Sequence, residues 1–204
     1  MLLVIDFFYS VMYHKNQVET SVSAKMRQST RKCISMNNEE KNTYVKQQIT
    51  STLLKLLENK DLNCISIKEL CDVANVGRAS FYRNYESKED VIRQYSNILI
   101  QQWGKEFESN PNSSIFNFFE SLFTHFEQNK TFYLCLHKMH MSQIILDTIK
   151  QTMQINSDLP SKEAYGRSWL AYGIYGLIEE WIARGMLESP AQMNQLIAEN
   201  AKMQ

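Results

Sequence analysis

Residues 66–85 read SIKELCDVANVGRASFYRNY and predict two short helices joined by a tight turn. Ser66 and Glu69 have the spacing of a capping box, in which the hydroxyl accepts the backbone N–H three residues on and the carboxylate reaches back. Apolar residues at steps of three and four then predict a first helix over residues 67–74. The Asn-Val-Gly that follows contains two residues that tolerate a left-handed backbone, so we expect the first helix to end there.

The second helix, predicted over residues 78–84, is too short to be stable alone in water, so tertiary contacts must hold it. Phe81 and Tyr85 lie one turn apart and can anchor it, which turns Ala79 and Arg83 to the opposite side. A polar helix with a diameter of about 10 to 12 Å fits a DNA major groove about 12 Å wide. The stretch is therefore interpreted as a helix-turn-helix. An ordinary helical hairpin with solvated arginines is the alternative.

The rest of the chain is also predicted to be helical, because no alternating strand-like run of useful length occurs. Further helices are expected near residues 40–58, 88–108, 114–128, 131–139, 141–156, 162–185 and 190–202. The fold class is therefore all-α. A three-helix DNA-binding domain over residues 38–90 is expected to be joined by a long helix to a helical ligand-binding, regulatory and dimerisation domain over residues 91–204.

The sequence FYRNYESKEDV at residues 81–91 resembles the hallmark of the TetR family of transcriptional regulators. In that family an aromatic-Tyr-x-x-aromatic recognition helix is followed by Ser-Lys-Glu and an aliphatic residue. Two departures occur in the preceding helix and turn, where Cys71 replaces the usual Ala and Asn75 the usual Gly. Both are mild, because Cys is small and Asn tolerates the left-handed turn. The motif-level resemblance covers residues 44–92.

The resemblance implies a homodimeric repressor that binds a near-palindromic operator in double-stranded DNA and is released by a small-molecule effector. Arg83 is expected to read a base, with guanine as its partner, while Tyr82 and Lys88 would meet phosphates. Lys88 also lies in the first turn of a helix, where free N–H groups favour an anion. The residues expected at the DNA are Ser66, Arg78, Ala79, Ser80, Tyr82, Arg83, Asn84, Tyr85 and Lys88. An activator, or a protein-interaction module of the same fold that does not bind DNA, is the alternative.

The helix predicted near residues 162–185 is apolar nearly all round, so it must be buried on two sides. One of its stripes carries Tyr165, Trp169 and Tyr172. The other stripe, together with the last helix, is expected to pack against the same surface of a second copy as a four-helix bundle. The expected dimer residues are Leu170, Ile174, Leu177, Trp181, Met193 and Ile197. The alternative is that both stripes belong to the core of one chain.

Aromatic and methionine side chains are frequent in residues 115–145, and they predict an adaptable apolar pocket for an effector. The expected lining is Trp103, Phe119, Phe123, Tyr133, His137, Trp169 and Tyr172. Plain core packing explains the same residues and stays open. His137 and His140 have the spacing of half a metal site, but no second pair of ligands is evident, so no metal or other cofactor is expected.

The 204 residues carry 22 Lys and Arg against 22 Asp and Glu, a formal net charge of zero, and 44% are hydrophobic. This composition excludes a disordered or collagen-like chain. The neutrality is a sum over unlike halves, because residues 1–100 hold 14 basic and 11 acidic side chains, whereas residues 101–204 hold 8 and 11. Three basic residues and one acidic residue lie between positions 74 and 88, so the arrangement favours DNA although the total does not.

No sequence motif of an enzyme is present: G-x-G-x-x-G, the P-loop, G-x-S-x-G and H-E-x-x-H are all absent, so no catalysis is expected. The four cysteines lack a disulfide-dense spacing, which favours a reduced, cytoplasmic protein. The apolar start MLLVIDFFYSVMY has no cleavage site and is shorter than the roughly 20 residues that a membrane span needs. It is therefore interpreted as neither a signal nor an anchor.

Residues 1–37 are expected to be a flexible N-terminal extension with two interpretations. The segment 21–35 is basic and contains no acid, so an arm of this kind would lie along DNA phosphates. Alternatively, the extension is a translated upstream region, and the native chain starts at Met26 or Met36.

Overall fold

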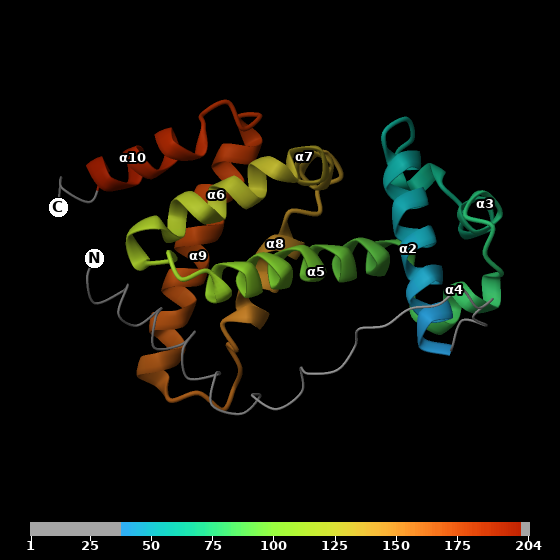
Figure 1. Ribbon diagram of the computed structural model, residues 1–204, viewed down its shortest axis with the longest axis horizontal. Helices are drawn as coiled ribbons and strands as arrows, with labels where there is room; N and C mark the ends of the chain where they lie inside the picture. The colour runs from blue at the N-terminus through green and yellow to red at the C-terminus, as the bar shows by residue number, and fades with distance from the viewer. Residues whose placement is uncertain (1–37, 201–204) are drawn as a thin grey trace, which may run out of the picture. The chain divides into compact units, whose positions relative to one another are not determined.

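The computed structural model describes residues 38–200, apart from the side chains of Ile115 and Asn200, and Figure 1 shows that these residues are helical with short connections. The elements are α2 (Asn38–Leu57), η1 (Leu62–Cys64), α3 (Ile67–Val73), α4 (Arg78–Asn84), α5 (Lys88–Ser109), η2 (Ile115–Asn117), α6 (Phe118–Gln128), α7 (Lys130–Lys138), α8 (Gln143–Thr152), α9 (Ser161–Ala183) and α10 (Pro190–Asn200). No strand occurs between residues 38 and 200. The prediction of an all-α fold is confirmed. The predicted extension, residues 1–37, lies outside the described residues.

The described chain divides into two compact units between Val91 and Ile92, beside the boundary expected after residue 90. The first unit holds α2, α3, α4 and the first turn of α5. The second holds the remainder of α5 and the helices α6 to α10. None of the helices described between residues 38 and 200 is both long and apolar enough to cross a membrane.

The first unit is built on a small core in which α2 packs on α3 and α4. Ile49 and Leu53 of α2 and Leu70 of α3 are fully buried there, next to Phe81 of α4. Burying each of these side chains contributes about 1.5 to 3 kcal/mol, and this offsets the instability of helices only two turns long. The first unit therefore holds α4 in place through tertiary contacts, as its length requires.

The turn between α3 and α4 forms largely as the sequence predicts. Ser66 caps α3, since its hydroxyl accepts the backbone N–H of Glu69 at 3.0 Å. The carboxylate of Glu69 pairs with Lys60 instead of reaching back, so only half of the capping box forms. This ion pair lowers the pKa of the Glu69 carboxyl. Asn75 adopts φ 53°, whereas Gly77 caps α4 with φ −66° and does not use its left-handed freedom.

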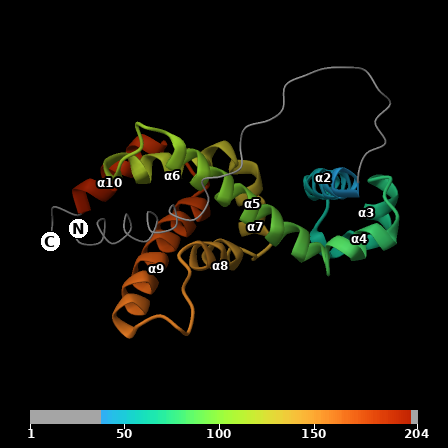
Figure 2. The same ribbon diagram turned by 60° about the horizontal axis from the view of Figure 1, so that its bottom comes forward.

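In the second unit α10 packs along α6, and α9 contacts α7 and α8 (Figure 2). Aromatic rings in contact form much of its core. Phe123 of α6 meets Trp181 of α9 edge to face at 5.2 Å, and Tyr133 of α7 lies 4.1 Å from the ring of Phe126. The Trp181 indole N–H donates to the carbonyl of Glu188 at 3.1 Å, which ties α9 to the connection that precedes α10.

The two stripes of α9 are used in the opposite way to the prediction. Leu170, Ile174 and Trp181 are buried within the chain, as is Met193 of α10, whereas Trp169 of the other stripe is 67% exposed. This corrects the predicted dimer surface: of its six residues, only Leu177 is exposed, and Ile197 is half-buried. Because α9 is apolar all round, its periodicity contains no information on which stripe faces the core.

The residues predicted to line an effector pocket do not gather at one place. Trp103, Phe123 and Tyr133 are packed into the aromatic core, and Phe119 stacks on Phe123. His137 faces away from them toward the carboxylate of Glu179, at 3.1 Å. Trp169 and Tyr172 belong to the exposed stripe of α9. The predicted lining is therefore divided into four residues of the aromatic core, two residues of the exposed stripe, and His137, which is paired with Glu179.

Candidate nucleic-acid interface

Helix α4 presents one face to solvent and buries the other. Phe81 is fully buried against α2 and α3, and its ring meets that of Tyr85 at 5.8 Å. Ala79 and Arg83 are exposed on the opposite side, Arg78 is exposed at the start of the helix, and Tyr82 is 60% exposed. The structure thus leaves Arg78, Ala79, Tyr82 and Arg83 accessible, whereas Ser80 and Asn84, which were also predicted to contact DNA, are half-buried. Ser66, the cap of α3, is also exposed.

Tyr85 does not belong to this surface, which corrects its prediction as a DNA contact. It is 4% exposed, and its hydroxyl lies 3.3 Å from that of Thr50 on α2. Burial raises the pKa of the Tyr85 hydroxyl, so the group stays neutral. Its role is to hold the end of α4 against α2, and the sequence indicated this second role through the spacing of Phe81 and Tyr85.

Lys88 begins α5, and its ammonium points back into the first unit. It donates to the carbonyl oxygens of Leu62 at 2.6 Å and Ile65 at 2.5 Å. These carbonyls lie in and after η1, so Lys88 ties the connection before α3 to the start of α5. Two of its three N–H groups thus have acceptors. The phosphate contact expected for Lys88 stays a prediction. One N–H group of the ammonium is left to make it.

The start of α5 is capped by side chains close to it in sequence. The hydroxyl of Ser87 accepts the backbone N–H of Asp90 at 3.2 Å, and the Asp90 carboxylate accepts the backbone N–H of Glu86 at 3.2 Å. The cap predicted at Ser87 is therefore present. The carboxylate bonds one residue earlier than an ideal capping box would require.

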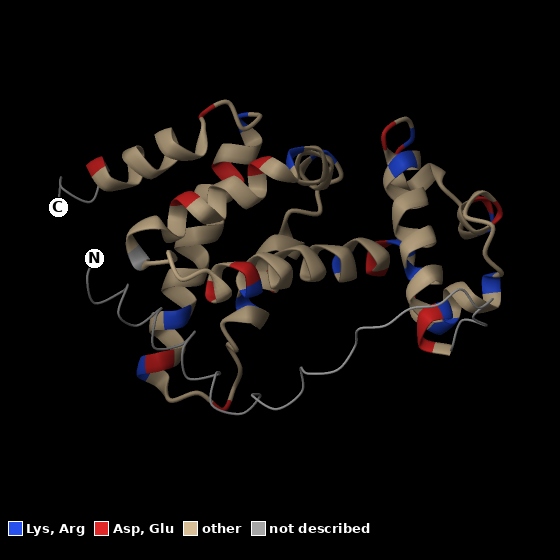
Figure 3. Cartoon of the chain, in the orientation of Figure 1, with Lys and Arg blue, Asp and Glu red and all other residues tan. Residues whose placement is uncertain are grey.

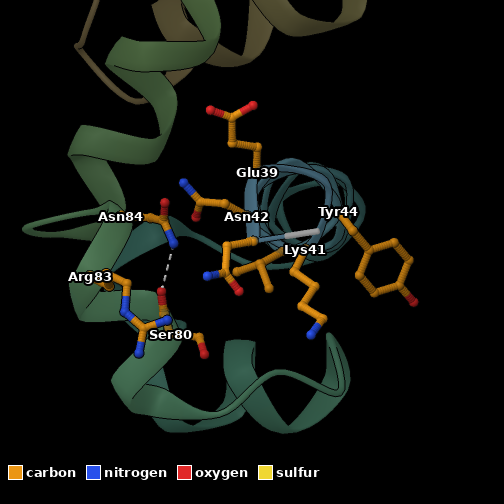
Figure 4. Close-up of a pocket in the computed structure, with 9 residues that line it drawn as sticks. Glu39, Lys41, Asn42, Tyr44, Ser80, Arg83 and Asn84 are labelled. Atoms are coloured by element: carbon orange, nitrogen blue, oxygen red, sulfur yellow. Dashed lines mark hydrogen bonds between the residues drawn. The ribbon is translucent and has the colours of Figure 1, made fainter. Parts of the chain in front are cut away.

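A hollow of about 680 Å³ lies between the start of α2 and α4, as Figure 4 shows. It is lined by Asn38, Glu39, Lys41, Asn42, Tyr44, Val45, Ser80, Arg83 and Asn84. The amide of Asn84 donates to the carbonyl of Ser80 at 2.9 Å and so helps to fix the α4 wall. The hollow adds the first turns of α2 to the exposed face of α4, with Arg83 common to both.

Sequence reasoning missed the α2 side of this hollow. Asn38, Lys41 and Asn42 are a polar helix start before the first apolar residue of the periodic pattern, and such residues are ordinarily solvated. The only available signal was their position, since a helix that packs beside α4 can bring its own end toward the same exposed surface.

Two cations line the hollow, although the first unit is not basic overall. Residues 38–91 contain 8 Lys and Arg against 9 Asp and Glu, so this unit is not basic overall. Figure 3 shows acidic and basic residues side by side at the start of α2, next to α4. Lys41 and Arg83 line the hollow, and within residues 38–200 neither pairs with a carboxylate. Both cations are therefore available to a negatively charged partner.

His137 and His140, which have the spacing of half a metal site, have no further ligands placed beside them in the described part of the chain. His137 is paired with Glu179, and His140 is exposed with a left-handed φ of 57°. Between residues 38 and 200, no three His, Cys, Asp or Glu side chains are placed to hold one metal ion. The described residues therefore offer no metal site to set beside the surface of α4.

Comparison with known proteins agrees with this architecture. A family described as the C-terminal region of transcriptional regulators, TetR_C_8, matches residues 113–202. The chain is 24% identical over 166 residues to YxbF of Bacillus subtilis, an uncharacterized HTH-type transcriptional regulator, and the match covers 74% of this chain. The chain spans 43% of the length of that relative.

Solved structures share the fold. Lin0861 from Listeria innocua superposes with a TM-score of 0.67 at 21% identity, covering 83% of this chain and 96% of that one. NalD of Pseudomonas aeruginosa, the secondary repressor of the MexAB-OprM multidrug efflux pump, superposes with a TM-score of 0.50 at 14% identity, covering 79% and 95%. The second unit matches the TetR C-terminal region, and the sequence of α4 and the start of α5 resembles the TetR hallmark. Residues 113–202 are thus similar to the C-terminal region of TetR transcriptional regulators, and the chain as a whole is similar to an HTH-type transcriptional regulator.

Proposed function

We propose that this chain is a sequence-specific DNA-binding transcriptional regulator whose α4 enters the major groove. The observation that carries the proposal is the division of α4 into two faces. Phe81 and Tyr85 hold it from inside, and Arg78, Tyr82 and Arg83 are exposed on the outside. An arginine in that position can bond bidentately to guanine, which is the commonest specific contact in the major groove.

A binding titration on DNA from upstream of the chain's own coding region tests this proposal. The parent protein is titrated into that duplex and into a duplex of the same length and composition with shuffled sequence, at several salt concentrations. We expect tighter binding to the natural duplex and a loss of affinity on both as salt rises, because counterions are released from the phosphates. Equal, salt-independent binding to both duplexes would favour the protein-interaction module.

We also propose that the chain acts as a homodimer through the exposed stripe of α9. Tyr165, Trp169 and Tyr172 are each more than half exposed, and Leu177 at the border of the other stripe is also exposed. A helix face with so much apolar surface is typical of an interface. Gly173 lies on the same side, and a Cβ there would have no neighbour within 4 Å, so another helix can approach closely.

A second copy is the occupant that fits this stripe. An isologous dimer packs the same helix face against itself, which makes a four-helix bundle from α9 and α10 of both chains. It also gives two copies of α4 for a near-palindromic operator. Sedimentation over a range of concentrations checks this: a mass that rises from monomer to dimer supports it, and a monomer at all concentrations contradicts it.

In this proposal the dimer represses transcription in the cytoplasm, and a small-molecule effector held in the second unit releases it from DNA. The support is the course of α5, which begins in the first unit and continues through the second, so that ligand binding in one biases the other. A reporter gene behind the bound sequence decides the sign of regulation. Deleting the regulator should raise expression, whereas a fall would make the chain an activator.

A further inference from the structure

The hollow beside α4 points to a second DNA contact. We propose that Lys41, with the amides of Asn38 and Asn42, binds the sugar–phosphate backbone next to the groove that α4 reads. The inference rests on the proposed function, because it assigns a further part of the same interface. The two contacts would have different roles. Helix α4 would read the DNA sequence, and the start of α2 would supply affinity for DNA of any sequence.

The chemistry of the lining is that of a phosphate contact. Lys41, Asn38 and Asn42 come from the first turns of α2, and Ser80 and Arg83 face them from α4 (Figure 4). Ammonium, guanidinium, amide and hydroxyl groups all donate hydrogen bonds, and phosphate oxygens only accept them. Lys41 is exposed, and among residues 38–200 it has no carboxylate partner that would have to be displaced.

The α2 side of the hollow is held in a fixed relation to α4. Thr50 of α2 and Tyr85 at the end of α4 lie within hydrogen-bonding distance, and the ammonium of Lys46 lies 6.0 Å from the ring of Tyr85. Both helices also share the buried core around Phe81. When α4 enters the groove, the start of α2 is therefore carried to a set position on the flanking backbone, and the backbone of α2 loses little conformational freedom on binding.

DNA fits the hollow better than a small free anion because the lining continues into the α4 face. Arg83 and Ser80 belong to both surfaces, so one extended polyanion can occupy both at once. Glu39 is the one carboxylate among the lining residues, and it would repel a phosphate brought close to it. This acid predicts an effect of opposite sign from that of Lys41.

Three matched variants test the contact: Lys41→Gln, Glu39→Gln and Lys55→Gln. Lys55 is exposed near the other end of α2, so its substitution changes the net charge and the same helix to the same extent as that of Lys41. Dissociation constants are measured on the natural upstream duplex and on its shuffled counterpart over a range of salt. Circular dichroism and thermal unfolding confirm that each variant is folded.

We expect Lys41→Gln to weaken binding to both duplexes by the same factor, roughly eightfold per chain near 0.1 M salt, and to lower the salt slope by about 0.9 per chain. Glu39→Gln should tighten binding to both duplexes. Lys55→Gln should have a clearly smaller effect than Lys41→Gln. The preference for the natural duplex should stay unchanged in all three variants, since none of them reads a base.

The proposal is overturned if Lys41→Gln and Lys55→Gln bind alike, or if Lys41→Gln changes only the preference between the duplexes. Arg83→Ala separates this failure from failure of the proposed function. If Arg83→Ala loses the preference while Lys41→Gln binds as the parent does, the DNA-reading role of α4 stands and the second contact falls. If the parent has no preference to lose and no salt-dependent affinity, both fall.

Discussion

Acid should destabilise this protein through one buried histidine in the second unit. His125 of α6 is 6% exposed, and its Nε2 lies 2.9 Å from the hydroxyl of Tyr133. Burial lowers the pKa of His125 from 6.5 to about 4, because the charged imidazolium is disfavoured away from water. The same surroundings raise the pKa of Tyr133, so the pair is held neutral in the folded chain.

The sign and the magnitude of this acid destabilisation follow from the pKa of His125 in the unfolded chain, 6.5, and in the folded chain, about 4. Below pH 6.5 the unfolded chain binds a proton at His125 and the folded chain does not, so protonation favours unfolding. The stabilisation is complete above pH 6.5 and is lost as the pH falls toward 4. At about 1.4 kcal/mol for each pH unit, the shift corresponds to about 3 kcal/mol, a large part of the stability of a small domain.

The assay is urea unfolding at fixed chain concentration at several values between pH 7 and about pH 4, for the parent and for two variants. His125→Gln removes the titrating ring and should lose about 3 kcal/mol less than the parent over this range. His140→Gln, a substitution at an exposed histidine, should follow the parent. The reasoning is refuted if His125→Gln and the parent have the same pH dependence, because the carboxylates would then account for all of it.

Four substitutions test the packing that holds the proposed interface and the dimer in place. Trp181→Ala should cost about 3 to 5 kcal/mol of unfolding free energy, because the indole is 2% exposed, whereas Trp169→Ala should leave the chain folded and shift sedimentation toward monomer. The reverse pattern would contradict the assignment of the two stripes. Tyr85→Phe should cost about 1 kcal/mol, and little of that cost should remain in a Thr50→Ala background if their hydrogen bond is the cause. Lys88→Met should lower the unfolding free energy by about 2 kcal/mol through loss of its two bonds to carbonyls, and an unchanged denaturation midpoint would show that these bonds are not stabilising.

The elements that could be predicted are those with local causes. Ser66 begins α3 because its hydroxyl accepts a backbone N–H three residues on. Asn75 ends the helix because it adopts a left-handed backbone conformation. Phe81 and Tyr85 are one helical turn apart, so their shared burial also follows from spacing alone. The other side of α4 is then left exposed, and this is why Ala79, Tyr82 and Arg83 are accessible, as their spacing from Phe81 predicts.

The parts that could not be predicted depend on contacts between distant segments. Lys88 donates to carbonyl oxygens 26 and 23 positions earlier in the chain, and no local sequence pattern predicts these hydrogen bonds. Helix α9 is apolar on every side, so the choice between its stripes is made by helices distant in sequence that pack against it, such as α6, whose Phe123 contacts Trp181. The hollow beside α4 likewise exists only because α2 and α4 meet in space.

Selection from a pool of random DNA duplexes tests the central claim most directly. The parent protein should enrich a near-palindromic sequence with two half-sites. Arg83→Ala should lose discrimination at one base pair of each half-site, equivalent to about 1 to 3 kcal/mol, while Arg93→Ala on α5 should keep the parent preference. If Arg83→Ala enriches the parent sequence with the same preference at every position, α4 does not read DNA through this arginine and the account is wrong.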